Sequence, residues 1–236
     1  MSQVLCYGIT RYDADPGALR TGLLTASIET IIFKDLVIYG HFLTAELQDA
    51  LKRLDIELIS SYQELMQQLH DQHESFVPLK LGFTMASEDD VRSLMQKNYE
   101  KIMTLLSRLR SKCEWTVVDT IPVSEVDDID FETTITVEGR GIDYLRQKVV
   151  ANQKEIHLKN RALALLEHIP NEVDRQTSWD KIGALYRLRC HILLDRGIDM
   201  NQPAITQKIS AKNKTVQGPF PPYHFSALTL DPPGTV

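Results

Sequence analysis

The chain has 236 residues, 43% of them hydrophobic, and a formal net charge of -6. A mildly acidic chain without a concentrated basic face does not suit phosphate neutralisation, so we expect no nucleic-acid partner. No apolar run approaches the roughly 18 residues that span a bilayer, so we expect no membrane association and a cytoplasmic protein. The three cysteines, Cys6, Cys113 and Cys190, are too far apart for a paired motif and are expected to be reduced, buried thiols.

The first third of the chain predicts the start of a mixed α+β fold. Residues 4–9, 30–34 and 36–39 are rich in β-branched and aromatic side chains and are expected to form strands. From Ser60 to His73 the apolar side chains recur at helical spacing behind a serine that can cap the first turn, which predicts a helix of about four turns.

The next stretch predicts a strand, a helix and another strand. Residues 76–84 have strand character, and Ser87 followed by three carboxylates is a strong helix start. We expect that helix to continue to about Arg110 and a strand to follow at 113–121. This order of elements predicts a split βαβ, ferredoxin-like sandwich over residues 1–120.

Residues 121–140 are acidic and are expected to link this domain to a C-terminal α+β domain at 141–236. That second domain should begin with a long helix, because its side chains follow a heptad spacing that predicts a coiled-coil seam with a partner. The seam consists of Ile142, Leu145, Val149, Asn152, Ile156, Lys159, Leu163 and Leu166.

The partner of this seam could come from the following segment. Trp179, Ile182 and Tyr186 are helically spaced, but from Ala184 onward apolar and polar residues alternate, which favours a strand. Residues 218–225 cannot be helical, because three prolines fix φ and lack donors. We expect an extended strip that packs along a sheet edge or contacts a partner.

Several patterns resemble chemical sites but are discounted. His70 and His73 are spaced for zinc, yet no third ligand accompanies them, and a polar helix end is the simpler interpretation. Gly139 and Gly141 imitate a dinucleotide-binding turn, but Tyr144 occupies the third glycine position. We therefore expect no catalytic residue, no cofactor and no metal.

Three stretches read together resemble the gas vesicle protein F/L family. They are the Val-Pro-Leu-Lys-Leu-Gly-Phe at 77–83, the Cys-Glu-Trp-Thr-Val at 113–117 and the Gly-Pro-Phe-Pro-Pro-Tyr-His-Phe at 218–225. The resemblance extends over nearly the whole chain and implies a modified ferredoxin-like N-terminal domain and a C-terminal α+β domain with a long coiled-coil helix.

The resemblance implies an accessory or minor structural protein of gas vesicles, associated with the vesicle in the cytoplasm. Its implied partners are the major gas vesicle shell protein and other accessory proteins. The candidate contact residues are Pro219, Phe220, Tyr223, Phe225, Leu145 and Val149. For Trp115, Tyr223 and Phe225 a place in an interdomain core is the stronger alternative. A second functional hypothesis is a small-ligand-binding regulator or enzyme, because a ferredoxin-like scaffold hosts many functions.

Overall fold

The computed structural model describes residues 3–12, 22–53, 56–127, 140–164, 174–202 and 214–226. Contacts divide the chain into two compact units, one made of residues 1–114 together with 220–236 and the other of residues 115–219. These bounds differ from the expected domains 1–120 and 141–236, because the C-terminal segment packs with the first unit.

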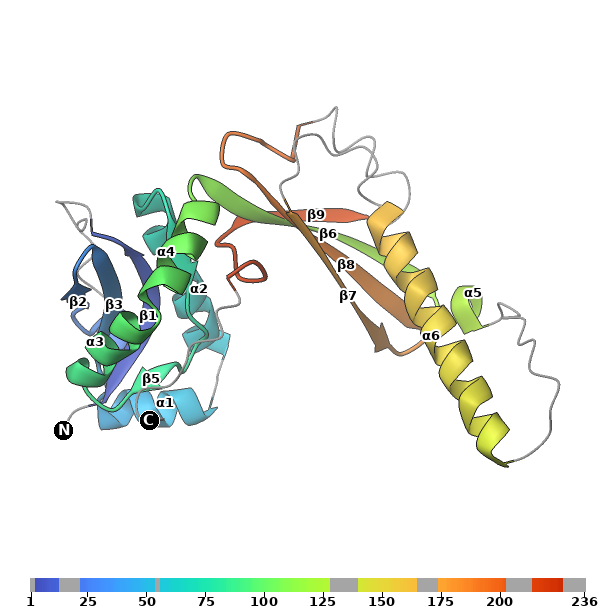
Figure 1. Ribbon diagram of the computed structural model, residues 1–236, viewed down its shortest axis with the longest axis horizontal. Helices are drawn as coiled ribbons and strands as arrows, with labels where there is room; N and C mark the ends of the chain where they lie inside the picture. Colours follow the sequence, from blue (N-terminus) through green and yellow to red (C-terminus); the bar gives the residue numbers. More distant parts are fainter. Residues whose placement is uncertain are drawn as a thin grey trace. The chain divides into compact units, whose positions relative to one another are not determined.

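The first unit contains a five-stranded sheet (Figure 1). Strand β1 (Val4–Arg11) pairs antiparallel with β3 (Leu36–Phe42) on one side and with β4 (Phe76–Pro78) and β5 (Thr84–Met85) on the other. Among the described residues, strand β2 (Glu29–Phe33) pairs with β3 alone and forms an edge of the sheet. The order β2-β3-β1-β4 therefore leaves β1 in the centre.

Four α-helices and one short 3-10 helix accompany this sheet. The helices are η1 (Leu23–Thr25), α1 (Ala45–Arg53), α2 (Ile56–Gln72), α3 (Glu88–Lys97) and α4 (Tyr99–Arg108). Ser87 caps α3 as predicted, because its Oγ accepts the N–H of Asp90 at 3.2 Å. The single long helix expected from 87 to 110 is wrong: Asn98 has φ -108° and ψ 13°, and its buried side chain donates to the carbonyl of Leu94. An asparagine that bonds the preceding turn favours a helix end, so α3 and α4 are separate.

The core of the first unit lies between its central strands and α2. It is built from Leu5, Tyr7, Val37, Tyr39, Leu47, Leu58, Tyr62, Leu65, Met66, Leu69 and Phe76, and Tyr223 from the C-terminal segment packs against it. The strands approach closely at Gly8, where a Cβ would lie 2.3 Å from Cζ of Phe76. Any larger residue at position 8 would therefore displace the Phe76 ring.

The second unit contains a four-stranded sheet in the order β7-β8-β6-β9. Its strands are β6 (Lys112–Pro122), of which Trp115 onward belongs to this unit, β7 (Asp174–Ile182), β8 (Leu185–Asp195) and β9 (Thr215–Phe220). Strand β8 lies between β6 and β7, which are joined through α6 (Arg140–Ala164). This arrangement is a split βαβ unit, so the ferredoxin-like strand order expected for the N-terminal half also occurs here.

Helix α6 packs on the sheet of the second unit through its C-terminal half (Figure 1). Leu158 and Ala162 are 3% and 0% exposed and form a cluster with Ile121, Val126 and Leu188, against which Trp179 and Tyr186 also pack. The helical spacing of Trp179, Ile182 and Tyr186 is misleading, because residues 174–182 form strand β7. The α+β class expected from the sequence is confirmed, and the partner of α6 within the described residues is a sheet.

A buried polar pair joins β1 to β3 in the first unit. The hydroxyl of Tyr7 lies 2.5 Å from Nδ1 of His41 and accepts the N–H of Leu23 at 3.2 Å. His41 is 2% exposed, and its Nε2 has no hydrogen-bond partner among the described residues. Burial lowers the pKa of His41 below its usual value, because a charged imidazole would lose its hydration there. Burial therefore favours the neutral form of His41 in the folded protein.

The burial of His41 predicts acid sensitivity. The unfolded chain takes up the His41 proton near its ordinary pKa of 6.5, whereas the folded chain takes it up only at a lower pH, because burial lowers the pKa. The free energy of unfolding should therefore be constant above that pH and fall below it, by at most about 1.4 kcal/mol per pH unit for this residue. Urea denaturation from pH 8 to pH 5 measures this slope. His41→Gln should flatten the slope, and an unchanged slope in this variant would contradict the assignment.

Candidate partner-binding surfaces

The C-terminal segment that was expected to meet a partner lies largely inside the first unit. Pro221 and Pro222 are buried, Tyr223 packs against the core and Phe225 is 2% exposed. Pro219 and Phe220, at the end of β9, are exposed, Phe220 by 38%. Four of the six candidate contact residues thus belong to this segment, and two of those four are internal.

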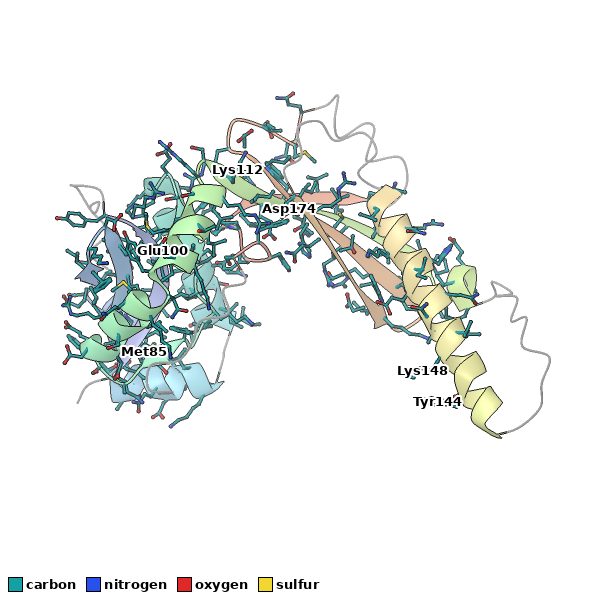
Figure 2. The ribbon with its side chains drawn as sticks, viewed as in Figure 1. Met85, Glu100, Lys112, Tyr144, Lys148 and Asp174 are labelled. Atoms are coloured by element: carbon teal, nitrogen blue, oxygen red, sulfur yellow. The ribbon has the colours of Figure 1, made fainter. Side chains whose placement is uncertain are left out.

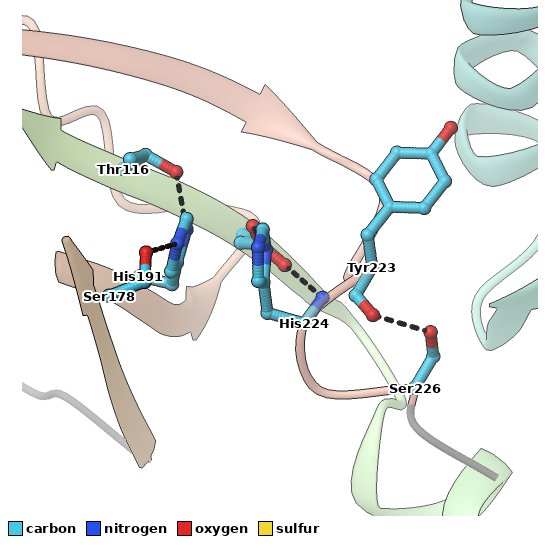
Figure 3. A network of polar contacts seen from close by, with 7 residues as sticks. Thr116, Ser178, His191, Tyr223, His224 and Ser226 are labelled. Atoms are coloured by element: carbon cyan, nitrogen blue, oxygen red, sulfur yellow. Dashed lines mark hydrogen bonds and ion pairs between the residues drawn. The ribbon is translucent and has the colours of Figure 1, made fainter. Parts of the chain in front are cut away.

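A buried carboxylate fixes this segment (Figure 3). The side chain of Glu114 is 2% exposed and accepts the backbone N–H of His224 at 2.8 Å through Oε2. Its Oε1 lies 2.6 Å from Nδ1 of the same histidine. The next turn is closed by the hydroxyl of Ser226, which donates to the carbonyl of Tyr223 at 3.0 Å. Both carboxylate oxygens therefore have partners, which offsets the cost of burying Glu114.

Within the second unit, His191 joins three strands (Figure 3). It lies on β8 and is 3% exposed, with Nδ1 3.0 Å from the hydroxyl of Thr116 on β6 and Nε2 3.3 Å from the hydroxyl of Ser178 on β7. Because each ring nitrogen faces a hydroxyl, the imidazole is held between the strands. We assign it a structural role in the sheet.

The histidines spaced for zinc occupy positions in the interior. His70 is 2% exposed and its Nε2 lies 3.0 Å from the carbonyl of Lys112. His73 is 4% exposed and its ring centroid lies 5.2 Å from that of Tyr39. The expected polar helix end is therefore wrong, because both side chains face the core. The sequence signal for this was the apolar spacing of α2, since position 70 lies on the buried face of the helix and position 73 directly follows its last residue, Gln72.

The described part of the acidic stretch holds α6 in place. Helix α5 (Ser124–Asp127) carries Glu125, which lies 3.5 Å from Arg161, and Asp127, which lies 3.0 Å from Lys154. The hydrogen bond from Lys154 lowers the pKa of the Asp127 carboxyl. Residues 128–139, the rest of the expected linker, lie outside the described residues.

The heptad positions of α6 from Val149 to Lys159 are exposed to solvent, and Figure 2 shows Tyr144 and Lys148 near the N-terminal end of the same helix. Val149 and Ile156 are 36% and 48% exposed, and Asn152 and Lys159 are exposed as well. Leu145 belongs to α6 by its backbone, but its side chain lies outside the described residues. The expected covering of this seam is therefore not found in the part of the chain that the structure describes.

The outer edge of β2 is a surface that the sequence did not indicate. Phe33 and Leu36 flank the turn between β2 and β3, so the alternate residues Thr30 and Ile32 direct their backbone groups away from β3. The carbonyl of Ile32 accepts a hydrogen bond from Arg92 of α3 at 2.5 Å. The structure shows no other partner for the outward backbone groups of these two residues within the described ranges. Strand order is a tertiary property, and for that reason the sequence alone did not reveal the edge.

The two units define an α+β protein with strand-edge and helix-face surfaces exposed to solvent. None of the described helices is long and apolar enough to cross a membrane. A family model described as gas vesicle synthesis protein GvpL/GvpF matches residues 3–227. The chain therefore belongs to the GvpL/GvpF family, as the resemblance in the sequence had indicated.

Solved structures agree with this assignment. The chain is similar to the crystal structure of the gas vesicle protein GvpF from Anabaena sp. PCC7120, with a TM-score of 0.64, 15% identity and coverage of 97% of this chain and 98% of that one. It is also similar to GvpF from Microcystis aeruginosa, with a TM-score of 0.66, 10% identity and coverage of 97% and 100%. No curated protein matches. At these identities the likeness to the two structures establishes the fold.

The position of Phe225 predicts a large loss of stability on truncation. Phe225→Ala removes a side chain that is 2% exposed, so the free energy of unfolding should fall by about 3–5 kcal/mol. Phe220→Ala, at a side chain that is 38% exposed, should change it by less than about 1 kcal/mol. Urea denaturation measures both. Equal effects of the two substitutions would show that the segment is not anchored through Phe225.

The two faces of α6 should likewise differ in their effect on stability. Leu158→Ala opens a cavity against the sheet and should cost about 2–5 kcal/mol. Ile156→Ala, on the opposite face, should cost less than about 1 kcal/mol. Thermal and urea denaturation of the two variants, side by side, provide the measurement. A greater loss in Ile156→Ala would mean that the heptad face, and not the Leu158 face, is the packed one.

Proposed function

We propose that this protein is a non-catalytic accessory protein that binds the major gas vesicle shell protein and other accessory proteins in the cytoplasm during vesicle assembly. Membership of the GvpL/GvpF family supports the gas vesicle context. The observation that carries the binding role is the open edge of β2 in the first unit. It offers backbone groups to an incoming strand.

A strand edge suits a partner that is itself built into a sheet. A shell subunit exposes apolar strands before it joins the growing wall, and such strands pair readily with one another and aggregate. A partner strand added to β2 would satisfy the backbone groups of that subunit until it is incorporated. In this mode the main-chain hydrogen bonds contribute affinity and the alternate side chains contribute specificity.

The chemistry of the β2 edge fits this role. The strand is Glu-Thr-Ile-Ile-Phe, with one charged residue and no proline, and the side chain of Ile32 is 39% exposed. By contrast, the edge strand β9 of the second unit ends in Gly-Pro-Phe, and edge prolines block strand addition. Thr30 offers an N–H and a carbonyl to a partner, and Ile32 offers an N–H.

Arg92 controls one position of this edge. Its guanidinium donates to the carbonyl of Ile32 and lies 3.3 Å from Glu88, which holds it beside the strand. An incoming strand would take over the carbonyl of Ile32 and release Arg92 to solvent. The arginine thus protects the edge against unspecific pairing while the protein is free.

The test replaces an outward N–H of the edge strand. Ile32→Pro removes a donor to the incoming strand but none of the bonds to β3, so an affinity pull-down of co-expressed shell protein should lose about tenfold in retention, or about 1.4 kcal/mol. Thr177→Pro is the matched control, because it lies at an outward position of the edge strand β7. The thermal midpoints of both variants check the fold.

Three outcomes bear on the proposal. Loss of retention in Ile32→Pro alone supports the β2 edge. Equal retention in wild type and Ile32→Pro shows that binding occurs elsewhere. If the intact protein retains no shell protein while another accessory protein does so under the same conditions, the proposed binding function is wrong.

A further inference from the structure

Helix α6 has two apolar faces, and within the described residues one of them is packed and the other is exposed. Leu158 and Ala162 are buried against the sheet of the second unit. An α-helix turns about 100° per residue, so Ile156 lies about 200° and Val149 about 180° around the helix from Leu158. Their exposed fractions of 48% and 36% agree with that geometry. The second face therefore points away from the sheet.

The spacing of this second face is that of a helix partner. Val149, Ile156 and Leu163 follow one another at intervals of seven residues, with Asn152 and Lys159 between them. An average spacing of 3.5 residues keeps a stripe aligned with a second helix, whereas a surface packed on a sheet has no need of it. Near its N-terminal end α6 also extends beyond the strands, and there Tyr144 is 59% exposed (Figure 1).

The charges on the two sides of α6 differ in their pairing. Towards α5, Lys154 and Arg161 lie within ion-pair distance of Asp127 and Glu125. Along the outer face, Lys148 and Lys159 are exposed, and within the described residues neither lies in an ion pair with a carboxylate. The one nearby contact of Lys148 is with the ring of Tyr144, 5.7 Å from its Nζ. The flank of the apolar stripe therefore presents two lysines and one exposed carboxylate, Glu155, one turn before Lys159, which leaves an excess of one positive charge.

We infer that the outer face of α6, from Val149 to Leu163, binds an amphipathic helix of another protein that carries carboxylates beside its apolar stripe. The apolar residues supply the contact area and the lysines select a partner of opposite charge. This inference rests on one part of the proposed function, namely that the protein acts by binding other proteins. It concerns a different unit and a different kind of contact from the β2 edge.

A second copy of the chain does not fit this face equally well. A parallel pair in register would place Lys159 of one copy against Lys159 of the other within the seam, and like charges there are destabilising. Asn152 can pair with a polar residue of a partner and so fix the register. The face therefore favours a different, acidic chain, and self-association is an outcome that the experiment distinguishes.

The experiment uses two synthetic four-heptad helices with the same Ile/Leu seam, one flanked by Glu and the other by Lys. Fluorescence anisotropy with the full chain should show binding of the Glu helix, at least tenfold weaker binding of the Lys helix, and weaker binding of the Glu helix at high salt. Lys159→Glu should reduce or reverse this preference. Ile156→Ser should weaken the affinity for the Glu helix about tenfold. Ile182→Ser, at a 43% exposed side chain of the β7–β8 hairpin, should leave that affinity unchanged.

Other results would overturn the inference. These are binding of neither helix, equal binding of both, or an Ile156→Ser variant that binds like the wild type. A dimer in analytical ultracentrifugation that Ile156→Ser dissociates would assign the face to a second copy instead. Retention of the shell protein by Ile156→Ser, measured in parallel, separates a failure here from a failure of the proposed function.

Discussion

The buried carboxylate of Glu114 fixes the C-terminal segment in the first unit. Glu114 ends the first stretch of the N-terminal unit, and through its two bonds to His224 it holds the segment that returns more than a hundred residues later in the sequence. That segment delivers Tyr223 to the core and buries Phe225. In sequence, the second unit is thus an insertion in the first. The first unit is complete only when the segments before and after that insertion pack together.

The surfaces proposed for binding lie on elements other than this C-terminal segment. In the part of the chain that the structure describes, strand β2 pairs with the sheet on one side, and α6 packs through one of its two apolar faces. The two surfaces recognise different structures, because a strand edge selects extended backbone and a heptad face selects a helix. A protein with both can contact two partners, or two parts of one partner, without competition between them.

Local patterns predicted most elements, and tertiary relations account for the rest. The β-branched runs marked β1, β2, β3 and β6, and Ser87 marked the start of α3. Periodicity located α6 but could not say which of its two stripes meets the sheet, since Leu158 is outside the heptad and only packing selects it. The motif at 218–225 indicated the family, and for Tyr223 and Phe225 the sequence favoured the core without excluding a partner contact. Strand order, which makes β2 an edge, is set by contacts distant in sequence.

The insertion of the second unit affects the order in which the protein matures. A ribosome releases the first unit's strands and helices early, but the residues that complete its core, Tyr223 and Phe225, emerge only after the whole of the second unit has been made. The N-terminal unit is therefore the first to begin folding and the last to finish.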